Sequence, residues 1–568
     1  MYSNKENINI LTALLVQHKV KHVVVCPGSR NSALVHNFNE HPDLICHPVT
    51  DERSAGFMAL GMSLQTFNRP VAVCVTSGSA LLNLLPAVAE ATYQKCGIVV
   101  ISSDRPAQWV DQLDGQTLPQ QGALGNFVAK SVSLPEPHND EERWYCARLV
   151  NEAFIALGRT YKSVHINVPV TEPFFDFTAK ELPKVRCTRL VKWEDEDSRE
   201  MLIDQICSSH RPMVVFGQNS RFDIADEIVE VLGERVPVLY EPLGIDEMPV
   251  CLTDQMISVI DCEDKSYHPD LVLYFGGHTV SKRLRQYLRK LPESVRVIMV
   301  NNDGELRDVT MHADFVVLGD GGDNYEIQKK IYDNLNHVYS LDKAYTRKWA
   351  ALRKKVEKAH LVYEPEYSSM LAVKLFEEEH YYLDGVYYAN SMSVRLGSIY
   401  ADHHIKCNRG LNGIEGSLST AAGASLAEPD KNVFCVIGDL SFFYDENALW
   451  QQQLSGNFRI LLLNNNEGAI FRSLKGLEAS PVRDTMIAAS HNLTAKGICK
   501  QFSLNYKTVT KKEELEEGIK WLCTVKSKRP VVLEVITKAE DDQRVYKEYY
   551  KSLKEDKEDK AVKGRSRK

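Results

Sequence analysis

Residues 437–471 read IGDLSFFYDENALWQQQLSGNFRILLLNNNEGAIF, and this stretch decides how the chain folds. An apolar run ends at Gly438-Asp439, a helical pattern follows, and a second apolar run ends at three asparagines, 464–466. Strand, helix and strand in this order indicate two parallel strands covered by a helix. Because parallel neighbours end at the same edge of a sheet, we expect Asp439 and the asparagines to lie close together.

The residue types at that edge favour a magnesium ion that also holds a diphosphate. A carboxylate, a carboxamide oxygen and a backbone carbonyl are the hard oxygen ligands that Mg²⁺ prefers, and Gly438 allows the backbone to approach a phosphate closely. Each piece alone is more often an ordinary turn or loop cap. Together, about 26 residues apart and each preceded by a predicted strand, they predict a metal and diphosphate site.

Short β-branched runs alternate with helical patterns along nearly the whole chain, which predicts parallel sheets covered by helices. Strands are expected at 22–26, 71–76, 98–102, 164–168, 213–216, 271–275, 296–300, 315–318, 386–390, 433–437, 459–463 and 530–536. We predict three α/β domains at 1–180, 190–345 and 360–550, with a linker near 172–198, a helical stretch at 343–380 and a charged tail at 551–568.

The composition argues against a nucleic-acid or membrane partner. The 568 residues carry a formal charge of −8, whereas binding to a phosphate backbone requires a basic face. No apolar run approaches the roughly 20 residues that span a bilayer, and the amphipathic N-terminus does not resemble a signal peptide. The thirteen cysteines are scattered without a CxxC pair, which favours reduced thiols. We expect a soluble cytoplasmic protein with no stable membrane insertion.

The first domain offers one acidic side chain in a suggestive place. Segment 50–62 reads TDERSAGFMALGM, and a helix beginning near Asp51 would leave Glu52 in its first turn. We expect one face of this helix to carry Ala55, Met58, Ala59 and Met62. Taken alone, Glu52 is best interpreted as a capping acid.

Two motifs together resemble the thiamine diphosphate enzymes. The stretch after 437 is similar to their GDG-x(~25)-NN motif, with Leu440 in place of the third glycine, and TSGSALLN at 76–83 is similar to their TSGPGxxN motif. The resemblance implies an α/β fold of three doubly wound parallel-sheet domains, which are pyrimidine-binding, central and diphosphate-binding. It also implies a glutamate, here Glu52, that hydrogen-bonds N1′ of the coenzyme and promotes loss of the C2 proton.

The resemblance further implies the cofactors and their ligands. Thiamine diphosphate would be held with Mg²⁺, or Mn²⁺ in its place, by Asp439, Asn465 and the carbonyl of Glu467. The triple asparagine leaves Asn466 as an alternative to Asn465. Contacts to the coenzyme are expected from Gly438, Leu440, Ser441 and Ile414, the last of which would support its bent shape. Because the activating acid and the metal ligands come from different domains, which in this family usually belong to different subunits, a homodimer or homotetramer is implied.

Basic side chains beside Gly and Ser, or just after predicted strands, indicate the substrate class. Arginine recognises carboxylates through two parallel hydrogen bonds, so a cluster of arginines suits substrates with several carboxylates. The segments PGSRNSAL, SSDRP, SKRL, NSMSVRL and NRGLNGIEG resemble one family closely, the 2-succinyl-5-enolpyruvyl-6-hydroxy-3-cyclohexene-1-carboxylate (SEPHCHC) synthases of menaquinone biosynthesis.

That family is a transferase family that decarboxylates 2-oxoglutarate and adds the succinyl group to isochorismate. The resemblance implies that isochorismate and its product are held by Ser29, Arg30, Arg105, Gln116, Lys282 and Arg283. The succinyl carboxylate would be held by Ser391 and Arg395, with Arg409 near the reacting carbons and Ile470 and Phe471 forming an apolar wall. We interpret the pair His403-His404 as structural.

Two alternatives stay open. An acetohydroxyacid-synthase-like or oxalyl-CoA-decarboxylase-like carboligase would need a central domain that binds FAD or ADP, and residues 190–340 contain no G-x-G-x-x-G loop. A catalytically silent binding member of the fold would not need Glu52.

Overall fold

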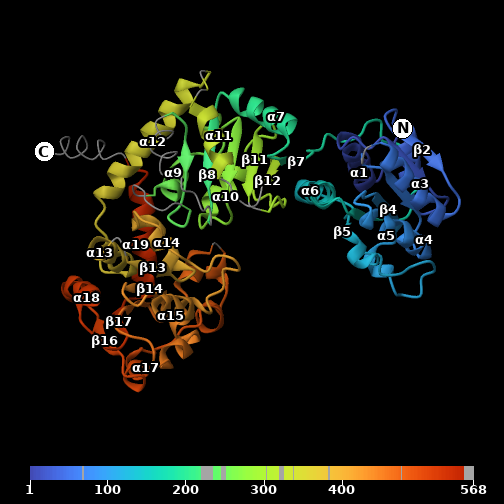
Figure 1. The fold of residues 1–568 in the computed structure, drawn as a ribbon. Helices are drawn as coiled ribbons and strands as arrows, with labels where there is room; N and C mark the ends of the chain where they lie inside the picture. The colour runs from blue at the N-terminus through green and yellow to red at the C-terminus, as the bar shows by residue number, and fades with distance from the viewer. Residues whose placement is uncertain are drawn as a thin grey trace. The chain divides into compact units, whose positions relative to one another are not determined.

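The structure is a computed structural model that describes residues 1–66, 69–218, 235–244, 251–301, 303–318, 325–336, 338, 340–381, 384–474 and 476–555. The chain divides into two compact units. The first unit is Met1–Asp204 with Arg296–Ile327, and the second is Gln205–Val295 with Gln328–Lys568. Figure 1 labels the helices and strands along the chain, and each unit is described by itself.

The first sheet lies wholly in the first unit and has the order β2-β1-β3-β4-β6-β5, with its neighbours parallel. Its strands are β1 (His22–Val25), β2 (Ile45–Pro48), β3 (Ala72–Val75), β4 (Val99–Asp104), β5 (Val128–Ser133) and β6 (Ser163–Pro169). Its helices are α1 (Glu6–Gln17), α2 (Ser32–Glu40), α3 (Glu52–Gln65), α4 (Ser79–Asn83), α5 (Leu85–Tyr93) and α6 (Asp140–Thr160), with single turns η1 (Ala107–Trp109) and η2 (Gly125–Phe127).

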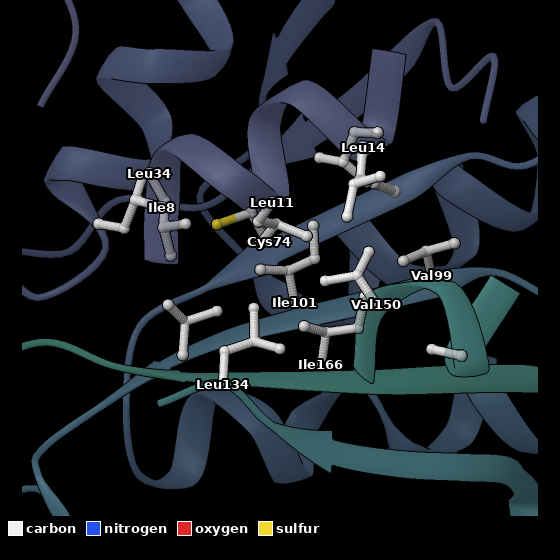
Figure 2. Packing of buried hydrophobic residues seen from close by; sticks show 14 of the residues in the cluster. Ile8, Leu11, Leu14, Leu34, Cys74, Val99, Ile101, Leu134, Val150 and Ile166 are labelled. Atoms are coloured by element: carbon white, nitrogen blue, oxygen red, sulfur yellow. The ribbon is translucent and has the colours of Figure 1, made fainter. Parts of the chain in front are cut away.

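Successive residues of these strands face opposite sides of the sheet, so each side needs its own cover. Val23 and Val25 join the core under α1, α2 and α6, whereas Val24 joins the core under α3 and α5. Figure 2 shows the first of these cores, where Ile8, Leu11 and Leu14 of α1 lie over strand residues such as Cys74 and Ile101. Helices on both faces make this a doubly wound sheet.

The second sheet has the order β7-β12-β11-β10-β8-β9. Its strands are β7 (Arg189–Lys192), β8 (Pro212–Phe216), β9 (Val238–Leu239), β10 (Leu271–Phe275), β11 (Arg296–Asn301) and β12 (Ala313–Leu318). The helices of this part are α7 (Glu196–Cys207), α9 (Thr253–Val259), α10 (Lys282–Arg289) and α11 (Tyr325–Asn336), with the turn η3 (Lys265–Tyr267), and α12 (Lys343–Leu361) follows.

The third sheet lies in the second unit and has the order β13-β14-β15-β17-β16, again parallel. Its strands are β13 (Gly385–Tyr388), β14 (Val433–Gly438), β15 (Phe458–Asn464), β16 (Asn505–Val509) and β17 (Val531–Ile536). The helices are α13 (Ser369–Glu379), α14 (Met392–Tyr400), α15 (Ser417–Ala427), α16 (Asp439–Tyr444), α17 (Lys496–Gln501), α18 (Lys512–Thr524) and α19 (Ala539–Ser552), with the short turns η5 (Glu446–Trp450), η6 (Ala469–Ser473), η7 (Leu477–Ala479) and η8 (Arg483–Ile487).

The predicted fold class is confirmed. Three parallel sheets are present, and every strand expected from the sequence is found within a few residues of its predicted place. As the sequence predicts, β14 and β15 are neighbours, and Gly438 pairs with Leu463 at their carboxyl ends. The thirteen cysteines are free thiols, as expected. Among the described residues no helix is both long and apolar enough to cross a bilayer.

Three expectations about local structure are wrong. The stretch 172–198 is not linker throughout, because β7 lies within it and pairs with β12. On α3, Ala55 and Ala59 are buried but Met58 is 45% exposed, so the buried face is narrower than expected. The N-terminal helix is not amphipathic, since Asn7 and Asn9 are buried together with its apolar residues. Most of the charged tail, 556–568, lies outside the described residues.

Candidate active site

A cavity of about 240 Å³ lies at the carboxyl edge of the third sheet. Much of its lining comes from the loops that the sequence singled out, and it includes Ser391, Ile414, Gly438, Asp439, Leu440, Ser441, Asn465, Glu467, Ile470 and Phe471. Helix α19 supplies a further wall through Asp542, Gln543 and Tyr546. The cavity therefore brings together, within one unit, the residues predicted for the metal and the diphosphate, and Ser391 of the two predicted for the succinyl carboxylate; Arg395 is not part of its lining.

Asp439 is held rigidly at the start of α16. It is 4% exposed. Its Oδ1 accepts the backbone N–H of Leu440 at 2.7 Å, and its Oδ2 accepts those of Asn465 and Asn466 at 3.0 and 2.7 Å. Three backbone donors fix the direction of the carboxylate.

The asparagines have different environments. Asn464 is buried and its Nδ2 donates to the Leu493 carbonyl and to Glu534. Asn465 lines the cavity, and its Nδ2 donates to Asp542 Oδ2 at 2.8 Å. Asn466 adopts a left-handed backbone with φ of 67° and is absent from the lining of this cavity. Of the two candidates, Asn465 is therefore the one that lines the cavity, with its amide nitrogen held by Asp542.

Asp542 is the least expected member of this group. Besides Asn465, it accepts hydrogen bonds from the backbone N–H and hydroxyl of Ser369 at 2.7 Å each and from Thr537 Oγ1 at 3.0 Å. Burial raises the pKa of its carboxyl, and the four hydrogen bonds oppose that rise. Asp542 thus acts as an anchor that sets the orientation of Asn465.

Glu467 presents its backbone, and not its side chain, to the cavity edge. Both of its carboxylate oxygens bind Arg472, with Oε2 at 2.9 Å from Nη2. Its carbonyl accepts the N–H of Ala469 at 3.0 Å, which leaves a second lone pair for a cation. His491 also approaches this region, with Nε2 lying 3.5 Å from Asp439 Oδ2.

The ligand set fits the predicted cofactor. Asp439 Oδ1 and Oδ2, Asn465 Oδ1 and the Glu467 carbonyl are all oxygen atoms, as Mg²⁺ or Mn²⁺ requires. Ser441 is buried at the first turn of α16 and lines the same cavity, as do Gly438 and Leu440, so the residues predicted to contact the diphosphate share one space with the predicted metal ligands.

Three arginines gather beside the cavity. They are Arg395 on α14, Arg285 on α10 and Arg409, and their positive charges repel one another. Burial lowers the pKa of Arg285 and of Arg409, and this repulsion lowers it further. Arg409 donates through Nη1 to Asn390 Oδ1 at 3.0 Å, and its buried Nε has no hydrogen-bond partner. Within the described part of the chain, no hydrogen bond or ion pair to the half-buried Arg395 is found. Positive charges packed in this way are suited to an anionic ligand.

The two basic residues expected on α10 are not part of that cluster. Arg283 binds Asp254 Oδ2 at 2.5 Å and lies over the ring of Tyr550 at 4.2 Å, while Lys282 is exposed. Arg285, two residues further on, is the one that is coupled to Arg395. The segment SKRLRQ contains Lys282, Arg283 and Arg285, so the sequence showed that basic residues lie here. It did not show in which direction each side chain points from the helix.

Ser391 stands at a strained point of the chain. It caps α14 with φ of 70° and ψ of −126°, a conformation that side chains other than glycine seldom adopt. The preceding Asn390 is buried, and its Nδ2 donates to the carbonyls of Asn408 and Gly413 at 2.8 and 2.6 Å. The strain is thus supported by the loop that carries Arg409.

In the first unit, Glu52 occupies the first turn of α3. The capping role belongs to Asp51, whose side chain accepts the N–H of Ser54 at 2.7 Å, so the capping interpretation of Glu52 is wrong. Glu52 Oε2 accepts instead from Asn83 Nδ2 at 3.2 Å. Asn83 is the last residue of the TSGSALLN motif, so the two motifs of this domain meet at one point.

The other residues predicted in the first unit lie beyond the carboxyl ends of its strands. Arg105 binds Asp114 Oδ2 at 2.6 Å and donates to the carbonyl of Gln116 at 3.2 Å, and Gln116 has a left-handed backbone with φ of 58°. Arg30 is buried and binds Glu172 Oε1 at 3.1 Å, while Ser29 is exposed. Both arginines are therefore paired with acids that are far more exposed than they are.

Comparisons with known proteins agree with this geometry. Residues 8–127 match the family model "Thiamine pyrophosphate enzyme, N-terminal TPP binding domain", and residues 390–535 match "Thiamine pyrophosphate enzyme, C-terminal TPP binding domain". A protein of Bacteroides fragilis named 2-succinyl-5-enolpyruvyl-6-hydroxy-3-cyclohexene-1-carboxylate synthase is 42% identical over 98% of this chain and 100% of its own length.

Relatives of the same name occur in other organisms. The synthase of Phocaeicola vulgatus is 42% identical over 98% of this chain and 99% of its own length. The synthase of Flavobacterium johnsoniae is 32% identical over 94% of this chain and 96% of its own length. The chain belongs to the SEPHCHC synthase family. Membership in that family agrees with the thiamine diphosphate site predicted from the sequence.

The sequence analysis of this SEPHCHC synthase family member did not predict three of the residues at or near the site. Helix α19 carries Asp542 and Tyr546, which line the cavity. Helix α10 carries Arg285, which is coupled to Arg395. A signal existed for Asp542, since α19 buries it together with Val545, Tyr549 and Tyr550. An acid on a buried helical face needs partners, and here those partners belong to the site.

Proposed function

We propose that this chain is a thiamine diphosphate- and Mg²⁺-dependent transferase that joins 2-oxoglutarate and isochorismate into 2-succinyl-5-enolpyruvyl-6-hydroxy-3-cyclohexene-1-carboxylate, with loss of CO₂. The observation that carries this proposal is the cavity at β14 and β15, because Asp439, Asn465 and Glu467 line it together with residues 438–441. Full-length similarity to synthases of that name supports it.

When bound, the coenzyme supplies a carbon nucleophile that adds to the 2-oxo group and stores the electrons released with CO₂. Asp439, Asn465 and the Glu467 carbonyl would hold its metal, and Gly438 to Ser441 would contact the diphosphate. Glu52 would share a proton with N1′ of the aminopyrimidine ring. Its bond with Asn83 keeps the carboxylate at the start of α3 in a fixed direction.

The arginines explain the choice of donor. After loss of CO₂, the 2-oxoglutarate carbon skeleton keeps one carboxylate, and Arg395 with Ser391 would bind it through a fork of parallel hydrogen bonds. Ile470 and Phe471 form the apolar wall beside it. A site without a matched carboxylate would leave Arg395 unpaired, so pyruvate should be a poor donor.

Isochorismate would be held by Ser29, Arg30, Arg105 and Gln116, together with Lys282 and Arg283. Arg30 and Arg105 pair with the exposed acids Glu172 and Asp114, which the substrate carboxylates could replace. Arg409 would lie near the reacting carbons.

We also propose a homo-oligomer with active sites shared between subunits. Around Glu52 in the first unit, Phe57, Met58 and Leu82 are 42–45% exposed, and in the second unit Leu411 beside Ile414 is 95% exposed. Exposed apolar groups beside a site indicate a covering partner, and a second copy would supply one. We place the enzyme in the cytoplasm, where reduced thiols persist.

The donor assay tests the function. Full-length protein with coenzyme, Mg²⁺ and isochorismate should release CO₂ from 2-oxoglutarate at least a hundredfold faster than from pyruvate. Equal rates would contradict the proposal.

A second assay tests whether two subunits share each active site. It mixes the variant Glu52→Gln with the variant Asp439→Asn, each of which should be inactive alone. Exchanged dimers should recover about a quarter of wild-type activity, because half are mixed and each has one intact site of two. No recovery after verified subunit exchange would place both residues in one subunit's site.

A further inference from the structure

Away from the candidate active site, three side chains of the second unit converge on one point. Glu377 and His380 lie one helical turn apart at the end of α13, and His403 follows α14. Glu377 Oε2 lies 3.2 Å from His380 Nε2 and 2.9 Å from His403 Nε2, and the two Nε2 atoms lie 3.0 Å apart. The active-site residues described above do not include any of the three.

These groups are largely withdrawn from water. The exposed fractions of the side chains are 4% for Glu377, 2% for His380 and 13% for His403. Phe376 stacks on the His380 ring with centroids 4.8 Å apart. Burying a carboxylate and two imidazoles costs free energy unless each is paired, so the arrangement requires a partner that satisfies all of them.

The outer hydrogen bonds decide which atoms point inward. His380 Nδ1 lies 3.1 Å from the Tyr381 carbonyl, and His403 Nδ1 lies 3.0 Å from the His404 carbonyl. A carbonyl only accepts, so both Nδ1 atoms carry the proton. In the neutral ring, each Nε2 then presents a lone pair toward Glu377 Oε2. The other oxygen of Glu377 accepts from the Tyr388 hydroxyl.

Three electron-pair donors that face one another need a cation. A single extra proton would join one pair of atoms and leave the remaining lone pairs opposed. A metal ion at the centre contacts all three at once. Zinc with bonds of about 2.0–2.1 Å in a tetrahedron places its ligand atoms roughly 3.3 Å apart, close to the observed 2.9–3.2 Å. Histidines that bind a metal usually donate the N–H of their other ring nitrogen to an acceptor such as a backbone carbonyl, as both histidines do here.

We propose that Glu377, His380 and His403 bind a divalent transition-metal ion, of which zinc is the best match. Two imidazole nitrogens and one carboxylate oxygen select zinc over magnesium, which prefers oxygen alone. The site is thus chemically distinct from the oxygen-only site at Asp439. It gives His403 the structural role that the sequence predicted, through a ligand that the sequence did not indicate.

The metal would fasten α13 to the segment that leads to Arg409. From His403 the chain runs beside β13, where Lys406 donates its N–H to the Val386 carbonyl at 2.9 Å and accepts from Tyr388 N at 2.8 Å. Three residues later, Arg409 binds Asn390. The ion would therefore stabilise this segment without contacting substrate.

The test uses full-length protein loaded with thiamine diphosphate and excess Mg²⁺, so that the Asp439 site is filled. After removal of trace metals, zinc is titrated against a chromophoric chelator, and cobalt is then substituted for spectroscopy. Wild type should bind one tight zinc ion per chain, and the cobalt spectrum should show tetrahedral bands without sulfur charge transfer. His403→Gln and Glu377→Gln should each weaken this binding at least a hundredfold, and zinc should raise the melting temperature of wild type but not of these two variants.

His404→Gln is the matched control, because it replaces the neighbouring imidazole, which is not one of the three clustered side chains, and keeps the backbone carbonyl that faces His403 Nδ1. It should bind zinc as wild type does. X-ray absorption on the wild-type zinc protein keeps the proposal testable even if a variant fails to fold, since it should report two imidazoles and only nitrogen or oxygen ligands. The proposal is overturned by the absence of tight zinc binding, by sulfur ligation, or by equal affinity in folded His403→Gln.

Discussion

Replacing Asp439 by asparagine keeps the shape of the side chain and removes its charge, so it separates two roles of this residue. The carboxylate accepts three backbone N–H groups, one on Oδ1 and two on Oδ2. An asparagine has one acceptor oxygen. The least costly orientation turns this oxygen toward residues 465 and 466 and sets the amide nitrogen against the N–H of Leu440.

The magnitude follows from these contacts. One charge-assisted hydrogen bond is lost, which costs about 1.5–3 kcal/mol, and the two others become neutral and weaker. Because Asp439 is 4% exposed, water does not replace them. We expect Asp439→Asn to destabilise the metal-free chain by about 2–4 kcal/mol. Losing a unit charge near a cation costs about 4 kcal/mol at a separation of 4 Å and an effective dielectric constant of 20, so the Mg²⁺ concentration for half-saturation should rise by roughly a thousandfold.

Two measurements check both roles. Urea unfolding of the metal-free protein reports the first, and Mg²⁺ titration of coenzyme-dependent CO₂ release reports the second. Asp445→Asn is the matched control, since Asp445 ends the same short helix and binds only Ser419, at 2.7 and 2.6 Å. It should lower stability and leave the Mg²⁺ requirement unchanged. Wild-type half-saturation in Asp439→Asn, or an equal rise in Asp445→Asn, would refute the metal assignment.

Three further predictions follow from the same geometry. Arg395→Ala should raise the KM for 2-oxoglutarate at least tenfold and the KM for isochorismate by less. An unchanged KM for 2-oxoglutarate in steady-state assays would remove Arg395 from the succinyl site. Asn465→Ala should weaken Mg²⁺ activation more than tenfold in titrations, whereas Asn466→Ala should change it by less than threefold, and the reverse order would move the ligand by one position. Burial lowers the pKa of His165 from 6.5 to about 4, so the unfolded chain binds more protons between these values; this contribution to stability is complete above pH 6.5 and is lost as the pH falls toward 4. His165→Gln should flatten the dependence of the urea midpoint on pH in that window, and an unaltered slope would show that His165 does not titrate there.

The fold was predictable because parallel strands are buried on both faces and show as continuous apolar runs. Runs such as VFCVIG at β14 and RILLL in β15 were therefore placed correctly. Strands that carry charge or are very short were missed: β7 reads RLVK and β16 reads NYKTV. They pair at or near sheet edges, where one side is left partly to solvent, and the apolar pattern fades there.

Site residues were predictable where a motif fixes the backbone, and less so where a helix sets the direction. Gly438 ends β14 and Asp439 follows it directly, so their place was determined by the strand. On α10, consecutive residues point about 100° apart, so SKRLRQ alone could not tell that Arg283 would turn to Asp254 and Arg285 toward Arg395. Knowing that direction requires the partner side chains.

The arginine cluster is the clearest case of stability given up for function. Arg285, Arg395 and Arg409 repel one another in a partly buried place, and Glu241 is the carboxylate that partly offsets the charges of Arg285 and Arg409. Glu241 is itself buried and accepts the N–H groups of Val280 and Ser281 at 2.6 and 2.7 Å, so its charge is already shared. One acid cannot neutralise three cations. An anionic substrate would remove this imbalance on binding, and its carboxylate would then be held by charges that the folded chain keeps in place without it.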